Sequence, residues 1–414
     1  MQNFAKDKTE VKITFIGDIM CELPLLKASR TKNGYNFYSV FSHTQELFRK
    51  SDYVVGNLET VFAGKDMEYT NTLYSFNTPD EFLDALKTSG IDLFLTANNH
   101  CLDRGIYGLQ RTLKELDRRK MDHIGTYLNS KEREKVFIKN IRGMQFAFLN
   151  YTYGTGIKDN HVILEEKDLN IVNLLIPQHI GSPIRYNLKT SNAKSIKKFL
   201  GRIIPENEKL KLKRILRKPV GVPRTDEMWD ELLDPKLLNT LKKDIQNAKN
   251  NADYVIVNIH NGGQFNARPG KYSEFIMEFC AKAGADLIIG NHPHVVQKCE
   301  LIDGVPCAFS LGNYSISPST PYILFDNLPQ YSIAWHMIFD SSGICIDRSS
   351  FSVLKILEDN KHHLTVVDTY ELYNQIPEKE RHELQHDVKT ICEKFVLHQL
   401  ETFKIEKEYK IFGE

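Results

Sequence analysis

The chain has 414 residues, of which 41% are hydrophobic, and this length and composition allow a large buried core and more than one domain. With 54 lysines and arginines against 53 aspartates and glutamates, the net charge of +1 gives no general reason to expect nucleic-acid binding. The seven cysteines are scattered and include no C-x-x-C pair, which is typical of free thiols in a reducing compartment. We see no signal peptide and no run of 18 apolar residues, so we expect a cytoplasmic protein.

Short apolar runs alternate with helical patterns along most of the chain. Predicted strands, rich in Val, Ile and Phe, cover 11–17, 52–57, 92–98, 144–152, 252–260, 285–291 and 306–313. Predicted helices cover 79–90, 107–120, 237–250 and 272–284. This alternation predicts an α/β layer architecture. The later strands, 331–340 and 363–367, have no helix between them and indicate an antiparallel edge, and charged amphipathic helices are expected from Tyr370 onward.

Polar side chains follow the predicted strands at the point where each strand ends. The strand ends supply carboxylates, carboxamides and imidazoles, namely Asp18, Asn57, Glu59, Asn98, Asn99, His100, His260, His292, His294 and Asn313. In an α/β sheet, the carboxyl ends of the strands form the edge at which ligands bind. Mixed oxygen and nitrogen ligands without cysteine favour Mn, Fe or Zn over Ca. A bound metal would lower the pKa of its water to roughly 7 and so supply a hydroxide nucleophile.

Each of these residues also has a plain structural explanation when it is taken alone. An Asn or His at a strand end can simply hydrogen-bond its own loop, and the "HPH" turn at 292–294 could carry histidines that face solvent. Asp103 could cap the helix that starts near Ile106, or it could orient His100, three residues earlier. The gathering of all these groups on one rim favours the functional interpretation.

The stretches "FIGDIM", "GNLET", "TANNHCLDRGIYGLQRTLKEL", "HNGGQF", "GADLIIGNHPHVVQ" and "FSLGN", in this order, resemble the CapA family of capsule and poly-γ-glutamate synthesis proteins. That family is similar in fold to the calcineurin-like metallophosphoesterases. The resemblance implies a four-layer α/β/β/α sandwich with a metal centre on the strand-end rim. It divides the chain into a CapA-like domain at 11–345, with an insertion at about 160–232, and C-terminal strands and a helical appendage at 346–414.

The resemblance also implies roles for individual residues. Asp18, Asn99, His260, His292 and His294 occupy metal-ligand positions, and His100 is the proton donor. Asp103, which could orient His100, is the second candidate catalytic residue. Asn98, Gln264 and Asn313 are candidate substrate-binding residues on the same rim.

Three positions depart from the expected pattern. Met20 stands where the phosphoesterases have a ligating His, and Gln264 stands where CapA-like proteins usually carry Glu. Asn57 falls at the position of a bridging Asp, but a carboxamide cannot bridge two cations as a carboxylate does. Glu59, two residues later, would face the same side of the strand and could replace the bridge. We therefore expect one divalent ion rather than two.

These residues predict a metal-dependent hydrolase or processing enzyme in cell-surface polymer biosynthesis that cleaves an amide or a phosphoester. An alternative is a non-catalytic polymer-binding or assembly subunit, which Met20, Asn57 and Gln264 favour. A phosphodiesterase or nuclease is a second alternative, although we expect no nucleic-acid partner, because aromatic residues are not interleaved with the basic ones. The expected partners are an anionic polymer or its precursor, and a membrane-bound synthase.

A basic segment interrupts the family-like pattern. Residues 185–224 contain thirteen lysines and arginines and only two acidic residues. Within it, 195–204 has apolar residues near one helical face, flanked by Lys197, Lys198 and Arg202, and Pro205 should end such a helix. The pattern predicts a surface for a polyanion or an anionic membrane, with peripheral attachment at the inner membrane as the corresponding location.

Overall fold

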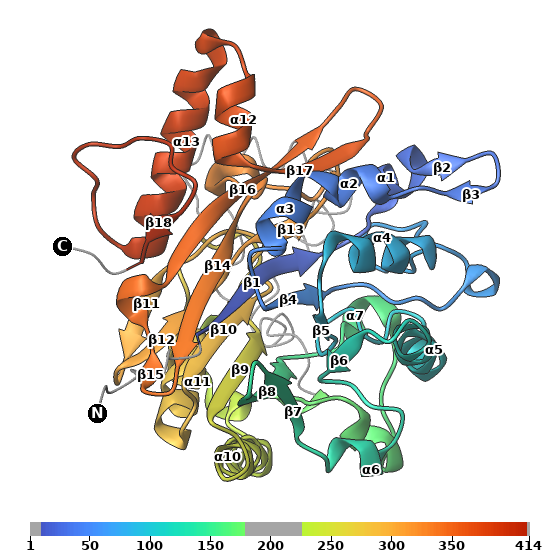
Figure 1. Ribbon diagram of the computed structural model, residues 1–414. Helices are drawn as coiled ribbons and strands as arrows, with labels where there is room; N and C mark the ends of the chain where they lie inside the picture. The colour runs from blue at the N-terminus through green and yellow to red at the C-terminus, as the bar shows by residue number, and fades with distance from the viewer. Residues whose placement is uncertain (1–9, 179–225, 412–414) are drawn as a thin grey trace, which may run out of the picture.

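The computed structural model describes residues 10–178 and 226–411, and its fold is α/β (Figure 1). Lys197, Lys198 and Arg202 lie outside the described residues. Across the described ranges, no helix combines the length and the apolarity needed to cross a bilayer.

The larger sheet has ten strands, and parallel and antiparallel pairs share it. Its main path follows the order β17 (Leu364–Asp368), β16 (Ser350–Glu358), β14 (Tyr331–Asp340), β1 (Val11–Ile19), β4 (Tyr53–Leu58), β5 (Leu93–Leu95) and β6 (Asp122–Ile124). Three short strands pair beside this path, β13 (Asn313–Ser315) with β1, β15 (Gly343–Ile344) with β14, and β18 (Tyr409–Lys410) with β16. β1, β4, β5 and β6 are parallel neighbours, whereas β14, β16 and β17 are antiparallel, as the missing helices predicted.

The second sheet has six strands with a parallel centre. Its order is β11 (Cys299–Ile302), β12 (Val305–Ala308), β10 (Leu287–Asn291), β9 (Tyr254–His260), β8 (Met144–Thr152) and β7 (Phe137–Ile141). A separate two-stranded ribbon joins β2 (Arg30–Thr31) to β3 (Gly34–Tyr35).

The described α-helices include the four predicted from the sequence. They are α1 (Leu23–Ala28), α2 (Tyr38–Phe41), α3 (Gln45–Phe48), α4 (Glu81–Ser89), α5 (Gly105–Arg118), α6 (Ser130–Arg133), α7 (Ile157–Asn160), α10 (Pro235–Lys249), α11 (Lys271–Ala283), α12 (Thr369–Gln375) and α13 (Glu378–Val396). The boundaries follow capping chemistry: the Asp234 side chain accepts from two backbone N–H groups at the start of α10, and Gly90 ends α4 at φ +96°.

Three apolar clusters show how these elements pack. One cluster lies between the two sheets and includes Phe15 of β1, Phe146 of β8 and Trp335 of β14, with α13 contributing Phe395. A second joins the other face of β1 and β4 to α1–α5, and a third joins β8, β9 and β10 to α10 and α11, which Figure 1 shows beside these strands. The period of two along each strand sends alternate side chains to opposite faces.

Candidate metal centre

The carboxyl ends of the central strands of the larger sheet bring the first polar groups together. Asp18 is the next-to-last residue of β1, and it lies in register with Asn57 of β4 on one side and with Asn313 of β13 on the other. A register shift between Ile16 and Asp18 turns this strand end. Glu59 follows β4 directly and is buried. Parallel pairing therefore gathers these groups at one edge of the sheet, as predicted.

The second sheet contributes the histidines from the ends of two parallel strands. His260 is the last residue of β9 and lies in register with Asn291, the last residue of β10. His292 and His294 follow in the turn after β10, at φ +102° and +57°, values that non-glycine residues rarely adopt. Backbone strain of this kind persists where the surrounding structure holds it, and it concentrates at functional sites.

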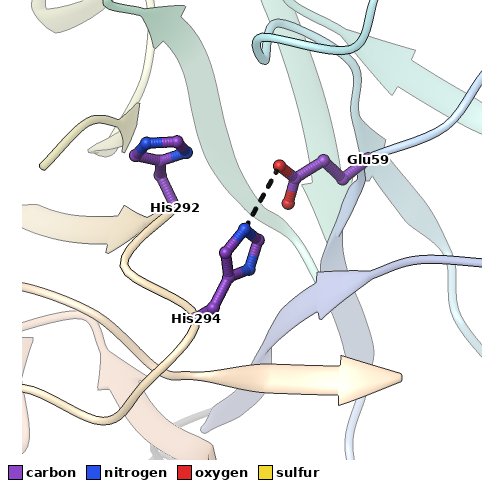
Figure 2. A group of neighbouring side chains, drawn as sticks. All are labelled: Glu59, His292 and His294. Atoms are coloured by element: carbon purple, nitrogen blue, oxygen red, sulfur yellow. Dashed lines mark ion pairs between the residues drawn. The ribbon is translucent and has the colours of Figure 1, made fainter. Parts of the chain in front are cut away.

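The two rims meet at Glu59, which is shared by two groups of candidate ligands. Atoms of Glu59, His292 and His294 lie within 4.8 Å of one another, and so do atoms of Asp18, Glu59 and His260. Figure 2 shows the first group, in which Glu59 Oε1 lies 3.8 Å from His294 Nε2. We call Asp18, Glu59, His260, His292 and His294 the metal cluster. Five of the seven residues predicted as metal ligands thus lie in these two groups, and the other two are beside them, with Asn57 2.7 Å from Asp18 and Asn99 2.6 Å from His260.

The metal cluster leaves ligand atoms unused, which is the property a cation site needs. Within the described residues, both carboxylate oxygens of Glu59 and the Nδ1 atom of His292 are buried without a hydrogen-bond partner. A buried carboxylate oxygen that accepts no hydrogen bond is costly, and a cation would satisfy it. Carboxylates and imidazoles are ligands that divalent transition metals accept. The buried cluster can therefore hold a divalent metal ion.

The carboxylate and the histidines of the metal cluster shift one another's pKa values in opposite directions. Burial would raise the pKa of Glu59, but the positive charges of His294 and His260 outweigh it and lower this pKa to about 2. Burial would lower the pKa of His294, but Glu59 and Asp18 raise it to about 9. For His292, burial and then repulsion by His260 and His294 lower the pKa well below its ordinary value. His292 is thus neutral, the form in which imidazole binds metals.

His100 and Asp103 form a buried pair beside the cluster. His100 Nδ1 lies 2.7 Å from Asp103 Oδ2, while His100 Nε2 points toward Glu59, 3.9 Å from its Oε1. Burial would lower the pKa of His100, but the Asp103 carboxylate raises it above its ordinary value. Asp103 also accepts from the backbone N–H of Phe76 and supplies no cap to α5, whose N-cap is Arg104. The sequence left open whether Asp103 caps the helix or orients His100, and in the structure it orients His100.

The asparagines of the rim mostly bind other site residues. Asn57 donates its amide to Asp18 Oδ1 at 2.7 Å, and Asn99 Oδ1 lies 2.6 Å from His260 Nε2. Asn313 Oδ1 lies 2.9 Å from His294 Nδ1, and Asn98 donates to the Leu58 carbonyl and accepts from the His100 N–H. These contacts support orienting roles for Asn98 and Asn313.

Comparison with known proteins identifies the family. The model of a family described as bacterial capsule synthesis proteins matches residues 12–318, most of the chain. The chain belongs to this capsule synthesis family. The family lies within the metallophosphoesterase-like superfamily, as the strand-end motifs indicated.

Two curated relatives carry the CapA name. The chain is 25% identical over 303 residues to the PGA biosynthesis protein CapA of Bacillus subtilis (strain 168), covering 73% of this chain and 62% of that protein. It is 24% identical over 312 residues to the capsule biosynthesis protein CapA of Bacillus anthracis, covering 75% of this chain and 60% of that protein. The chain thus spans about three fifths of the length of these relatives.

Two of the departures from the family pattern have a structural counterpart. Met20 is buried in the apolar cluster beneath α1–α5 and offers no ligand in place of the missing His. Glu59 lies where both ligand groups meet, as expected for a residue that replaces the carboxylate missing at Asn57. Gln264 is half-buried in the loop after β9, and within the described ranges it has no hydrogen bond to the metal cluster.

The sequence reasoning missed one rim residue, Tyr153. It directly follows β8, at a strand end like the predicted residues, but tyrosine is not among the usual metal ligands or proton carriers that mark such a site. Its ring centroid lies 4.7 Å from that of His292. Burial, followed by the negative charge of Glu59, raises the pKa of Tyr153 above its ordinary value, so that its hydroxyl keeps its proton.

Proposed function

We propose that this chain is a metal-dependent hydrolase that acts in the biosynthesis of capsule, poly-γ-glutamate or another anionic cell-surface polymer. Family membership supports the anionic polymer as the substrate, and the two buried oxygens of Glu59, which accept no hydrogen bond, support the metal. We also take the packing of the two sheets and their helices as the four-layer α/β/β/α sandwich of the metallophosphoesterases. A membrane-bound synthase is the partner we propose for such an enzyme.

Asp18, Glu59, His260, His292 and His294 would hold the ion, with Asn99 beside His260. We propose one ion of Mn, Fe or Zn, because the Asn57 amide donates to Asp18 and occupies the place of a second bridging ligand. When bound, such an ion polarises the scissile group and lowers the pKa of its water to roughly 7.

His100 and Asp103 would protonate the leaving group. The bond from Asp103 fixes the His100 ring, and His100 Nε2 then points to the side on which Glu59 lies. Because Asp103 raises the pKa of His100, the imidazolium is available near neutral pH. His100 donates this proton to the leaving oxygen or nitrogen as the bond to it breaks. General acids of this kind typically contribute 10²–10⁴-fold.

The test compares His100→Ala with His386→Ala, which removes an exposed histidine of α13. Chromogenic phosphodiester and γ-glutamyl anilide substrates are assayed side by side, and bound metal is measured by elemental analysis. We expect His100→Ala to lower kcat roughly 10²–10⁴-fold with bound metal unchanged. Loss of metal from His100→Ala, or full activity in it, would contradict the role of His100.

A non-catalytic polymer-binding subunit is the second candidate. The observation that favours it is the loss of ligands at two positions, with Met20 in the apolar core and Asn57 donating to Asp18. In that case, the purified protein would hold no metal, and it would bind poly-γ-glutamate and turn over neither substrate.

A further inference from the structure

Tyr153 is fixed on the rim of the metal cluster by its backbone. Its N–H donates to the His260 carbonyl at 3.1 Å, which continues the parallel pairing of β8 and β9 beyond Thr152 and His260. The position of the ring therefore depends on the strand that carries a candidate ligand. A residue held in this way can keep a constant geometry toward the site.

The ring of Tyr153 lies against two histidines of the cluster. Its centroid is 4.7 Å from that of His292 in a tilted arrangement, and 6.4 Å from that of His260 with the planes 11° apart. The histidines and Glu59 are almost fully buried, whereas Tyr153 is half-buried. Tyr153 is thus a more exposed neighbour of the buried histidines, and a side chain in this position can contact a substrate that reaches them.

Among the described residues, the hydroxyl of Tyr153 differs from that of its neighbour Tyr151 in its contacts. Tyr151, two residues earlier on β8, shows the structural alternative, because it is buried and its hydroxyl bonds Asp244. By contrast, no described residue hydrogen-bonds the hydroxyl of Tyr153. A phenol that a fold needs for stability normally finds a partner when it is buried.

We propose that Tyr153 is a substrate-binding residue whose hydroxyl donates a hydrogen bond to an anionic oxygen of the substrate at the metal cluster. This inference rests on the proposed function and specifies its recognition chemistry. The phenol O–H is a neutral donor, so it can bind a phosphate or carboxylate oxygen without adding a buried charge. The ring beside His292 would limit how the substrate approaches.

The test measures ligand binding rather than turnover. Protein loaded with Mn²⁺ is titrated calorimetrically with inorganic phosphate and, separately, with glutarate as a carboxylate probe. Tyr153→Phe keeps the ring and removes the donor, and Tyr370→Phe on α12 is the matched control. A hydrogen bond to a charged acceptor predicts that Tyr153→Phe raises the Kd of the recognised anion roughly ten- to a hundredfold, with bound Mn²⁺ and thermal melting unchanged. The anion whose affinity falls in Tyr153→Phe shows whether the hydroxyl binds a phosphate or a carboxylate oxygen.

Three outcomes would overturn the inference. Equal affinity of Tyr153→Phe and wild type for both anions would show that the hydroxyl makes no such hydrogen bond, and the proposed metal-dependent function would be unaffected. Binding of neither anion by metal-loaded wild type would do the same. Loss of Mn²⁺ from Tyr153→Phe would make Tyr153 a support of the metal site instead. Failure of the wild type itself to bind Mn²⁺, Fe²⁺ or Zn²⁺ is a separate result, because it overturns the proposed function and this inference together.

Discussion

Glu59 is the single residue on which the site depends most. It is fully buried, lies in both candidate ligand groups, and has three histidines within 4 Å of one oxygen. Another carboxylate of the same region, Glu22, is equally buried but accepts hydrogen bonds from the Ser317 N–H and the Tyr322 hydroxyl. Burial alone therefore does not distinguish a candidate ligand, whereas unused lone pairs do.

This contrast gives a matched pair of variants. Glu59→Gln keeps the shape but removes the charge, and we expect its affinity for Mn²⁺ or Zn²⁺ to fall more than about a hundredfold, since even the partners of ligands contribute roughly 10–100-fold. Glu22→Gln should bind metal as the wild type does. Calorimetric titration of the metal checks both, and equal affinities for the two variants would contradict the assignment of Glu59.

At the scale of elements, the sequence predicted the central strands of both sheets, but it did not predict which sheet each strand joins. Residues 306–313 were expected to form one strand. The structure divides them between β12 in the smaller sheet and β13 in the larger one, with Gly312 at φ +80° between. Apolar periodicity reports a buried strand but carries no information on sheet membership, and a glycine turn is compatible with either. β16 went unpredicted, although β14 and β17 on either side of it were found.

The same crossing explains why Gly17 precedes Asp18. A Cβ at Gly17 would lie 2.0 Å from the carbonyl oxygen of Gly312, so an alanine there must push β13 away from β1. We expect Gly17→Ala to destabilise the protein by about 1–3 kcal/mol, and to weaken metal binding because Asp18 shifts. Gly154→Ala, where nothing lies within 4 Å, is the control and should be neutral in urea unfolding. Equal free energies of unfolding for the two variants would show that β1 and β13 can separate without loss of stability.

His336 gives a prediction on pH at the same scale. It is buried in β14 between Thr14 of β1, at 2.7 Å, and Ser352 of β16, at 3.1 Å. Burial, and then the positive charge of Lys12, lower its pKa from 6.5 to about 3. The unfolded chain therefore binds a proton between these pH values when the folded protein does not, so that stability falls as pH falls.

The expected size of this loss is on the order of a few kcal/mol between pH 6.5 and 3. His336→Gln keeps the polarity without the titration and should flatten the acid limb of the free energy of unfolding, measured in urea across that range. His43→Gln, at an exposed position, should leave the limb unchanged. An acid limb equally steep in His336→Gln would assign the loss to other groups.

For the whole molecule, the near-neutral charge conceals an asymmetry. The segment 185–224 carries thirteen basic and two acidic residues, which leaves 41 basic and 51 acidic residues for the rest of the chain. A substrate of the proposed kind is a polyanion, and an acidic body would repel it. The metal cluster itself contains two carboxylates, Asp18 and Glu59, and Asp103 lies beside it; among the described residues, positive charge there comes from the histidines.

We therefore propose that the basic segment attracts the anionic polymer or an anionic membrane to this protein. Each Lys or Arg near an anionic surface contributes on the order of 1 kcal/mol, so reversing Lys197, Lys198 and Arg202 to Glu should weaken binding by several kcal/mol.

Binding to poly-γ-glutamate and to phosphatidylglycerol vesicles is measured separately at low and high salt, with Lys32→Glu, Lys65→Glu and Lys114→Glu as a control of equal charge at exposed positions. Added salt should weaken the wild-type interaction in the same direction, because the attraction is screened. Hydrolysis of a small soluble substrate should be unchanged by the triple reversal. Salt-insensitive binding, or equal losses in both triple variants, would show that the local excess of charge has no such role.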